Sequence, residues 1–355
     1  MLSIVGTALV GTACTTSSPP EVPRSDAASE PPATSFGSND RATIAFHSDP
    51  GGRDDTYVMS GEGTRPTPVT DGSETIAQPV WSPDGRRMAI TCCTSDPGHL
   101  FVVDGPGATP IDLAPDVAGA ANPSWSPGGS AIAFESTDDG LLYLVDVTGA
   151  EPGLPHTLGV AGAAPSWSPD GRHIAFFNER DDDLDIFTMA VDGTGVERLT
   201  HDRAPDYSPV WSPNGRHIAF VSERDGDQDI YVMDADGSHQ IDVSRDRWPD
   251  DFPAWSPDGR DIAFVAYLHG ADPHTIGDGD AEIFVVAADG THLRDVSRNR
   301  AWDGDPSWSP DGGRIAFTRR TGHAQVMVMR ADGSDQQRLR GMPGMANDCC
   351  PAWRP

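Results

Sequence analysis

The segment Ser208–Ser244 reads SPVWSPNGRHIAFVSERDGDQDIYVMDADGSHQIDVS, and it decides the fold of the chain. Its first apolar run, Val210–Trp211, is closed by Ser-Pro-Asn-Gly, a turn sequence in which glycine adopts a positive φ. Three further apolar runs follow at 217–222, 229–233 and 241–244, separated by two Asp-Gly turns. The segment therefore predicts four short antiparallel strands joined by tight connections.

This unit repeats along the chain with a period of about 44 residues. The motif Trp-Ser-Pro-x-Gly, or a shortened copy of it, begins at Trp81, Trp125, Trp167, Trp211, Trp255, Trp308 and Trp353. An Ile-Ala-Phe-like triplet begins at Ile44, Met88, Ile132, Ile174, Ile218, Ile262 and Ile315. An aromatic-Val-Met-like triplet begins at Tyr57, Phe101, Tyr143, Phe187, Tyr231, Phe284 and Met327. Because three separate signals each occur seven times, the sequence predicts a repeat protein.

The predicted strands are apolar on both sides, so both faces of each small sheet must be covered. One repeat cannot cover its own sheet, whereas sheets stacked radially around an axis cover one another. We therefore expect an all-β fold: a seven-bladed β-propeller of four-stranded antiparallel blades. The first unit lacks a Trp strand and Trp353 lacks a following strand. We expect the strand at Trp353 to pair with the N-terminal segment around Ile44 and close the ring.

The chain divides into three predicted regions. Residues 1–14 read MLSIVGTALVGTAC, an apolar stretch that is too short to span a bilayer and ends at Cys14. Residues 15–40 are rich in Ser, Thr, Pro and Ala, which predicts a disordered tether before a propeller at 41–355. This layout resembles a bacterial lipoprotein, which implies a leader cut before Cys14 and a lipid on its thiol. Plain secretion and an apolar terminus without a targeting role are the alternatives. Lipid anchoring and secretion both imply an extracytoplasmic protein.

The charge balance excludes some partners. The chain has 25 basic residues, all of them arginine, against 54 acidic ones, for a formal net charge of −29. Nucleic acids and anionic membrane surfaces bind clustered positive charge, so we expect no nucleic-acid partner and membrane contact only through a lipid anchor. We expect a monomer.

The repeat resembles a known family. Pro-x-Trp-Ser-Pro-Asp-Gly-x-x-Ile-Ala-Phe, followed by Asp-Ile-Tyr-Val-Met-x-x-Asp-Gly, is similar to the WD40-like (PD40) repeats of TolB-type propellers over nearly all of 41–355. TolB itself carries an α/β domain before a six-bladed propeller, whereas here a tether precedes seven repeats. The resemblance implies an extracytoplasmic, non-catalytic scaffold that binds a protein or glycan of the cell envelope.

The candidate binding surface is the rim formed by loops such as 223–228 and 245–249, which differ between repeats; we call it the variable rim. Four aspartates each lie five residues before a motif tryptophan: Asp206, Asp250, Asp303 and Asp348. They form either a ring that binds a cationic ligand at the channel mouth, or local bonds to backbone amides and to arginines such as Arg180 and Arg224. Trp248 and Trp302 lie outside the motif, in rim loops, and are candidates for ligand stacking or for local packing.

Two rim loops are candidates for metal binding. Asp225, Asp227 and Asp229 alternate along one loop, as acidic residues do at 181–185, and suit Ca²⁺ or a simple solvated turn. The loop 265–282 is nine residues longer than its counterpart and holds His269 and His274. These histidines suit a transition metal or a solvated partner contact. With a metal, they would support the alternative function of a polysaccharide lyase or hydrolase, because the blades resemble oligogalacturonate lyases that hold Mn²⁺ through histidines. No catalytic motif occurs, and no other cofactor is expected.

The remaining cysteines form two adjacent pairs, Cys92–Cys93 and Cys349–Cys350. In the expected ring these pairs lie in neighbouring blades. Because export favours oxidation, we predict one or two disulfides between the pairs. A four-cysteine Zn²⁺ site is the alternative interpretation.

Overall fold

The described part of the chain is built of β-strands alone. The computed structural model describes residues 43–49, 55–63, 66–70, 76–92, 98–149, 152–180, 183–269, 271, 273, 279–339 and 347–355. These residues form 28 strands and no helix, so no described segment is a helix able to cross a bilayer. The predicted leader and tether lie outside the described residues.

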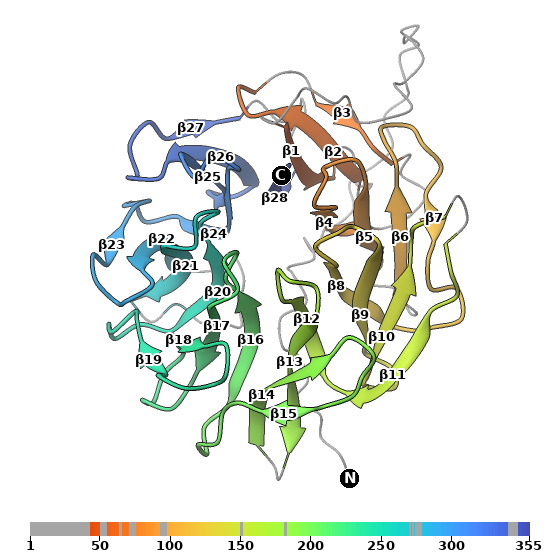
Figure 1. The fold of residues 1–355 in the computed structure, drawn as a ribbon. Helices are drawn as coiled ribbons and strands as arrows, with labels where there is room; N and C mark the ends of the chain where they lie inside the picture. Colours follow the sequence, from red (N-terminus) through yellow and green to blue (C-terminus); the bar gives the residue numbers. More distant parts are fainter. Residues whose placement is uncertain are drawn as a thin grey trace, which may run out of the picture.

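The strands follow one another in antiparallel groups of four, arranged around a common centre (Figure 1). The first group joins the last strand to the first three described strands: β28 (Asp348–Trp353), β1 (Thr43–Ser48), β2 (Asp55–Ser60) and β3 (Thr67–Pro68). The second is β4 (Ile76–Trp81), β5 (Met88–Cys92), β6 (His99–Val103) and β7 (Ile111–Asp112). The third is β8 (Ala120–Trp125), β9 (Ala131–Ser136), β10 (Leu141–Asp146) and β11 (His156–Ala161). The fourth is β12 (Ala163–Trp167), β13 (His173–Arg180), β14 (Asp183–Ala190) and β15 (Glu197–Arg198).

The later groups continue the same order. One is β16 (Asp206–Trp211), β17 (His217–Ser222), β18 (Asp229–Asp234) and β19 (Ile241–Asp242). The next is β20 (Asp250–Trp255), β21 (Asp261–Leu268), β22 (Asp280–Ala287) and β23 (Arg294–Asp295). The last is β24 (Trp302–Trp308), β25 (Arg314–Arg320), β26 (Ala324–Arg330) and β27 (Gln337–Arg338). These last two groups form one eight-stranded sheet through a single parallel bridge between Ala281 and Trp302.

The two apolar triplets of the repeat face each other across the second and third strands. Phe220 of β17 pairs with Tyr231 of β18, and their ring centroids lie 5.7 Å apart. The same cross-strand ring contact recurs in four other groups: Phe46–Tyr57, Phe134–Tyr143, Phe176–Phe187 and Phe264–Phe284. The predicted second strand, 217–222, coincides with β17, whereas the first strand begins four residues earlier than predicted, at Asp206.

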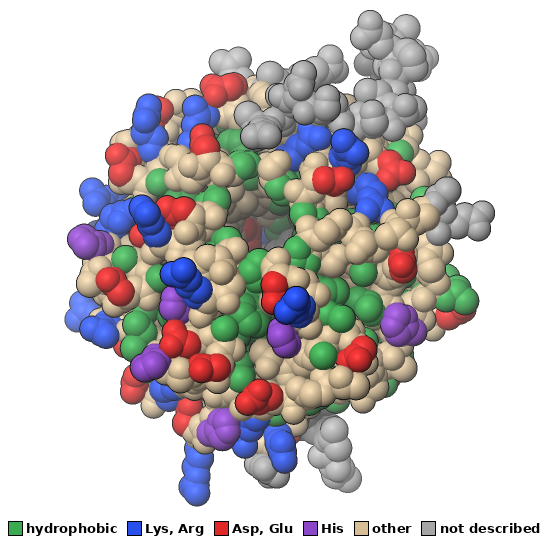
Figure 2. All heavy atoms as spheres, in the orientation of Figure 1, with side chains coloured by type: hydrophobic (Ala, Val, Ile, Leu, Met, Phe, Trp, Pro, Cys, Tyr) green, Lys and Arg blue, Asp and Glu red, His purple; other side chains and the backbone are tan. Residues whose placement is uncertain are grey.

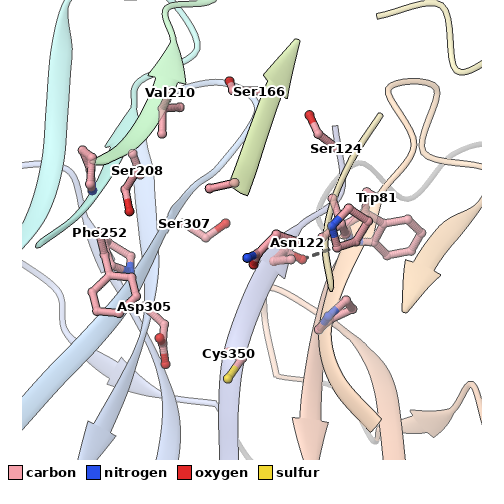
Figure 3. Close-up of a pocket in the computed structure, with 18 of the residues that line it drawn as sticks. Trp81, Asn122, Ser124, Ser166, Ser208, Val210, Phe252, Asp305, Ser307 and Cys350 are labelled. Atoms are coloured by element: carbon pink, nitrogen blue, oxygen red, sulfur yellow. Dashed lines mark hydrogen bonds between the residues drawn. The ribbon is translucent and has the colours of Figure 1, made fainter. Parts of the chain in front are cut away.

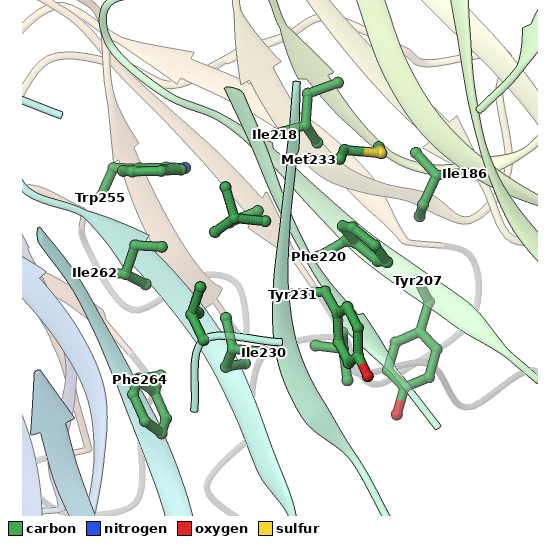
Figure 4. Packing of buried hydrophobic residues seen from close by; sticks show 14 of the residues in the cluster. Ile186, Tyr207, Ile218, Phe220, Ile230, Tyr231, Met233, Trp255, Ile262 and Phe264 are labelled. Carbon is green, nitrogen blue, oxygen red and sulfur yellow. The ribbon is translucent and has the colours of Figure 1, made fainter. Parts of the chain in front are cut away.

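Neighbouring sheets bury one another's apolar faces. In the largest cluster, Ile186 of β14, Phe220 of β17 and Ile262 of β21 come from three successive groups and are each 0% exposed (Figure 4). Close packing of this kind removes apolar area from water, and it is the main favourable term in folding. The interior of the molecule therefore consists of layers between sheets, as the apolar strands predict.

Four of the seven motif tryptophans connect their strand to the first strand of the preceding group. The indole N–H of Trp125 donates to the carbonyl of Val80 at 3.0 Å, and that of Trp255 donates to Val210 at 3.0 Å. Four such bonds are described: Trp81 to Ala352, Trp125 to Val80, Trp255 to Val210 and Trp308 to Ala254. The Ser-Pro-x-Gly loops act as architecture, because their serine hydroxyl accepts the backbone N–H five residues on in each, as from Asp261 to Ser256 (2.9 Å).

The two ends of the described chain meet in one sheet. Ile44 pairs with Trp353 and Ala45 with Ala352 in an antiparallel register. Trp353 is 7% exposed and packs with Ile44 and Phe46. The indole of Trp81 bonds the carbonyl of Ala352 at 3.1 Å, so the C-terminal strand also contacts the second group. The expected pairing of Trp353 with the N-terminal segment is therefore present.

We predict that Trp353→Ala lowers the free energy of unfolding by about 3–5 kcal/mol, since a buried indole is lost from the sheet that joins the chain ends. Chemical denaturation followed by circular dichroism measures this. Leu154→Ala is the control, because Leu154 is 81% exposed and its loss leaves stability within about 0.5 kcal/mol. Equal stability of the two variants would contradict the role given to β28.

Candidate ligand-binding channel

The first strand of each group is irregular three residues before its motif tryptophan. Six non-glycine residues at this position have a positive φ: Asn122 (49°), Ala164 (47°), Ser208 (54°), Phe252 (56°), Asp305 (53°) and Cys350 (56°). Each coincides with a shift in strand register. Non-glycine residues rarely adopt this conformation, and a β-bulge re-aims the side chain it carries. The repeat thus directs one side chain per strand out of the regular pleat.

These re-aimed residues line a cavity at the centre of the molecule. The cavity has a volume of about 610 Å³ and is bordered by all seven first strands, β4, β8, β12, β16, β20, β24 and β28. Figure 3 shows Asn122, Phe252 and Asp305 around it, each from a different strand. Figure 2 shows a central hollow on this face with apolar side chains at its border. We call this space the central cavity.

The wall of the central cavity combines a fixed and a varying part. The residue after each re-aimed position is proline: Pro123, Pro165, Pro209, Pro253, Pro306 and Pro351, with Pro79 in β4. Serine hydroxyls from Ser124, Ser166 and Ser307 add hydrogen-bonding groups. The re-aimed residues differ in size and polarity from strand to strand, so the wall suits a ligand with both apolar and polar groups.

Buried carboxylates support the cavity wall. Glu135 accepts hydrogen bonds from the Ala164 backbone (2.5 Å) and the Asn122 amide (3.1 Å). Asp305 accepts one from the hydroxyl of Thr318 at 2.8 Å. Burial raises the pKa of both carboxyl groups, with these hydrogen bonds opposing it.

Asp251 is the carboxylate in the wall with an unused acceptor. It lines the cavity and is 1% exposed; its Oδ1 accepts the Phe252 backbone N–H at 2.6 Å, whereas Oδ2 has no hydrogen-bond partner. Burial raises its pKa from the ordinary 3.8 to about 7. A buried unsatisfied oxygen is costly, so this atom is suited to accept a hydrogen bond from a ligand.

The comparisons with known proteins assign the fold to a family. The model of the TolB beta propeller domain (PD40) matches residues 143–273 and 251–355, more than half of the chain. The chain belongs to this TolB β-propeller family. A segment of 53 residues is 43% identical to the protein TolB homolog of Chlorobium luteolum, covering 15% of this chain and 12% of that protein. The match thus spans a small part of that relative.

Solved structures agree on the fold. TolB from Acinetobacter baumannii has a TM-score of 0.55 at 18% identity, covering 85% of this chain and 79% of its own. An oligogalacturonate lyase in complex with manganese has a TM-score of 0.61 at 14% identity, covering 83% and 84%. At these identities the likeness shows the fold alone, so the activity of this TolB-type propeller must be argued from its own residues.

The four rim aspartates of the TolB-type propeller do not form an open ring, which was one of their two predicted arrangements. Asp206, Asp250 and Asp303 are 0% exposed, Asp348 is 2% exposed, and none lines the central cavity. Arg224 bonds both oxygens of Asp206 at 3.0 Å, which matches the local-pairing alternative. All four residues lie at or next to the start of a first strand and are buried, so they do not form an open ring that could bind a cationic ligand.

Individual rim aspartates differ in how they are balanced. Arg319 bonds both oxygens of Asp303 (2.8 and 2.7 Å), and Ser48 donates to Asp348 at 2.6 Å. Burial raises the pKa of Asp348, as it does that of Asp206, to about 6. Both oxygens of Asp250 lack a hydrogen-bond partner.

The two rim tryptophans are placed differently from each other. Trp302 lies in β24, not in a loop; it is 2% exposed beneath the guanidinium of Arg320 (5.4 Å), so its ring is not accessible to a ligand. Trp248 is half-buried and contacts His269, whose ring centroid lies 5.3 Å away. His269 pairs with Asp280 at 3.0 Å. His274 lies outside the described residues, so the structure does not place the two histidines together.

The predicted acidic loop is partly assembled. Asp225 and Asp229 approach one another, and Asp242 of β19, which the sequence analysis missed, joins them; Asp227 is not part of this group. Burial, followed by the charges of neighbouring aspartates, raises the pKa of Asp229 to about 7. The register of β18 against β19 brings Asp242 there, and this register follows from the tight turn between them.

The C-terminal cysteines lie in a strand. Cys349 and Cys350 belong to β28, both are buried, and their Sγ atoms are 3.0 Å apart. Cys350 lines the central cavity. The side chains of Cys92 and Cys93 lie outside the described residues, so the disulfide and the zinc alternative stay predictions.

The re-aimed cavity residues were missed by the sequence analysis, although the sequence carries a signal for them. Each precedes the proline of the Pro-x-Trp motif. Proline and tryptophan recur there, whereas the residue before them changes in every described repeat, from Asn122 to Phe252 to Cys350. Variation next to an invariant internal motif indicates a position that is free to serve recognition.

We predict that Asp251→Asn reduces the loss of stability at raised pH. Since the folded pKa of about 7 exceeds the ordinary 3.8, the contribution of Asp251 is complete below pH 3.8 and is lost as pH rises through 7. Unfolding free energies measured at pH 5 and pH 8 should therefore fall less in the variant than in the wild type. Asp192→Asn, at an exposed turn, is the control. Identical pH slopes in wild type and Asp251→Asn would contradict this assignment.

Proposed function

We propose that the chain is a non-catalytic binding propeller that recognises a segment of a protein partner in its central cavity. One observation carries this proposal: in six first strands, a residue with a strained, positive φ lines the central cavity, and the six side chains all differ. Strained positions persist where the surrounding structure over-determines them, and they cluster at functional sites. A proline-lined wall with scattered hydroxyls, an amide and a carboxyl suits a peptide, which offers apolar side chains and backbone N–H groups.

We infer further that the repeats close into one ring of seven blades. Support comes from the pairing of β28 with β1, from the bond between Trp81 and Ala352, and from seven first strands around one cavity. Closure leaves no first strand free to pair with another chain, which suits a monomer that offers a cavity instead of an edge.

The proposed setting is outside the cytoplasm, with Cys14 as a lipid anchor and the partner a protein of the cell envelope. The apolar residues 1–14, the cysteine that ends them and the polar stretch 15–40 support this setting. Membership of the TolB propeller family supports binding as the role of the scaffold.

The polysaccharide lyase or hydrolase alternative has less support. No histidine occurs among the described residues that line the central cavity, and His269 is held by Asp280 and Trp248 at the variable rim. Fold likeness to a manganese-bound lyase at 14% identity does not place a metal in this chain.

Filling the central cavity tests the proposed function. Ser124→Trp places an indole in the wall and should abolish capture of the partner from an envelope extract by the immobilised full chain. Val196→Trp, at a position 47% exposed and away from the cavity, should capture it as the wild type does. Circular dichroism establishes that both variants fold. Undiminished capture by Ser124→Trp would overturn the cavity as the site, and capture of a glycan alone would overturn the protein partner.

Lipid anchoring is tested separately. Expressed in a bacterial host with its own leader, the full chain should partition into the detergent phase, because a diacylglycerol on Cys14 places two acyl chains in the membrane. Cys14→Ser should move it to the aqueous phase. Mass spectrometry of the N-terminal peptide identifies the lipid, and a wild-type chain found in the aqueous phase would contradict the anchor.

A further inference from the structure

Three carboxylates of one repeat converge at the variable rim. Asp225 follows β17, Asp229 begins β18 and Asp242 ends β19, and one ligand atom from each lies within 4.8 Å of the others. Ca²⁺ holds its oxygen ligands at about 2.3–2.6 Å, so oxygens on opposite sides of one ion are about 5 Å apart. The three oxygens are therefore spaced to contact a single ion.

The preceding repeat shows what this position holds elsewhere. Asp185 of β14 lies two residues before Phe187, as Asp229 lies two residues before Tyr231, and Arg198 occupies the register position of Asp242. The guanidinium of Arg198 neutralises Asp185 at 2.5 Å, and the Asp185 side chain is 0% exposed. Replacement of this arginine by Asp242 removes one positive charge and adds a negative one on the same backbone.

A buried carboxylate from the next repeat supplies an independent observation. Asp250 is 0% exposed and neither of its oxygens has a hydrogen-bond partner; the nearby Ser244 hydroxyl donates to Asp229 instead. The backbone N–H of Asp250 donates to the carbonyl of Gln228 at 2.6 Å, which places it directly beside Asp229. An isolated buried carboxylate is so costly that it is normally paired or bound to a metal.

The carboxyl of Asp250 lies close enough to this acidic group for its charges to act on it. The charges that act on it are those of Asp246, Asp229 and Asp242. These charges do not act on Asp251, the next residue along the strand, which lines the central cavity instead. Asp246 contributes a further buried oxygen, Oδ2, that has no hydrogen-bond partner.

The arginine that balances other rim aspartates is missing at Asp250. Arg224 pairs with Asp206 and lies two residues after Ser222, the strand partner of Asp206. The strand partner of Asp250 is Ala266, so the corresponding position is Leu268. Arg245, the cation next to the group, directs its guanidinium Nε to the carbonyl of Asp242 (2.8 Å). The arginines that neutralise Asp185 and Asp206 thus have no counterpart at Asp229 and Asp250.

We propose that Asp225, Asp229, Asp242, Asp246 and Asp250 bind one Ca²⁺ ion that joins the repeat of β16–β19 to that of β20–β23. The ligands are all carboxylate oxygens, which favours Ca²⁺ over Zn²⁺ and other metals that prefer histidine or cysteine. Ca²⁺ takes six to eight oxygens in flexible geometry, whereas Mg²⁺ demands a near-ideal octahedron, so ligands from two repeats and several loops suit Ca²⁺. The ion supplies the positive charge that Arg198 supplies in the preceding repeat.

The test uses the full chain, stripped with EDTA and desalted, in calorimetric titration and thermal melts with CaCl₂. The wild type should bind one Ca²⁺ per chain saturably and melt at a higher temperature with Ca²⁺. Asp242→Arg, which installs the residue of the preceding repeat, should lose both responses while its Ca²⁺-free melting temperature stays at or above that of the wild type. Asp250→Asn should weaken binding, and Asp236→Asn, at an exposed turn of the same repeat, should leave it unchanged.

Several results would overturn the proposal. The proposal is wrong if titration of CaCl₂ into the wild type gives no saturable heat and its melting temperature is the same in CaCl₂ and in EDTA. If Asp250→Asn binds Ca²⁺ as tightly as the wild type does, Asp250 is not a ligand and the proposal is wrong. This variant supplies the test if Asp242→Arg does not fold. MgCl₂ that matches CaCl₂ in affinity would overturn the choice of ion.

Discussion

The apolar surface on both faces of each sheet is the constraint on which this structure depends. Side chains such as Phe220 and Ile262 are 0% exposed only because a neighbouring sheet covers them. A sheet at either end of the chain would otherwise leave one face in water, at a cost of roughly 25 cal/mol per Å² of apolar area. Pairing of β28 with β1 places both ends in one sheet and removes that cost. The meeting of the first and last described strands is thus a consequence of the repeat itself.

The same constraint creates the central cavity. Sheets that pack side by side around an axis bring their first strands close together, and the motif tryptophans link them, as Trp255 links to Val210. Close packing restricts which residues these strands can contain. The bulge before each Pro-x-Trp is the position at which the side chain can differ between repeats. Asn122 and Phe252 share one backbone conformation and differ in chemistry. A scaffold fixed by packing therefore carries a recognition surface that is free to change.

The sequence predicts the strands well because their signals are local. Turns such as Ser-Pro-Asn-Gly and paired triplets place β17 at 217–222 without any knowledge of its neighbours. The side chains at strand ends were harder, because their environment depends on register. The position five residues before a motif tryptophan was interpreted as part of an open rim, but Asp206 at this position bonds Arg224. Trp302 was assigned to a rim loop, but Arg320 covers its ring. Asp242 escaped notice because it is distant in sequence from Asp225 and adjacent to it only through pairing of β18 with β19.

A repeat protein carries its own controls, and the departures between copies are the most informative positions. Asp185 is matched by Arg198 in one copy and Asp229 by Asp242 in the next, although the two copies share the same strand register. The proposed ion would balance the altered charge. Asp250, facing Asp242 from a third position without its arginine, makes the imbalance larger, and a bound cation is the simplest partner that chemistry offers.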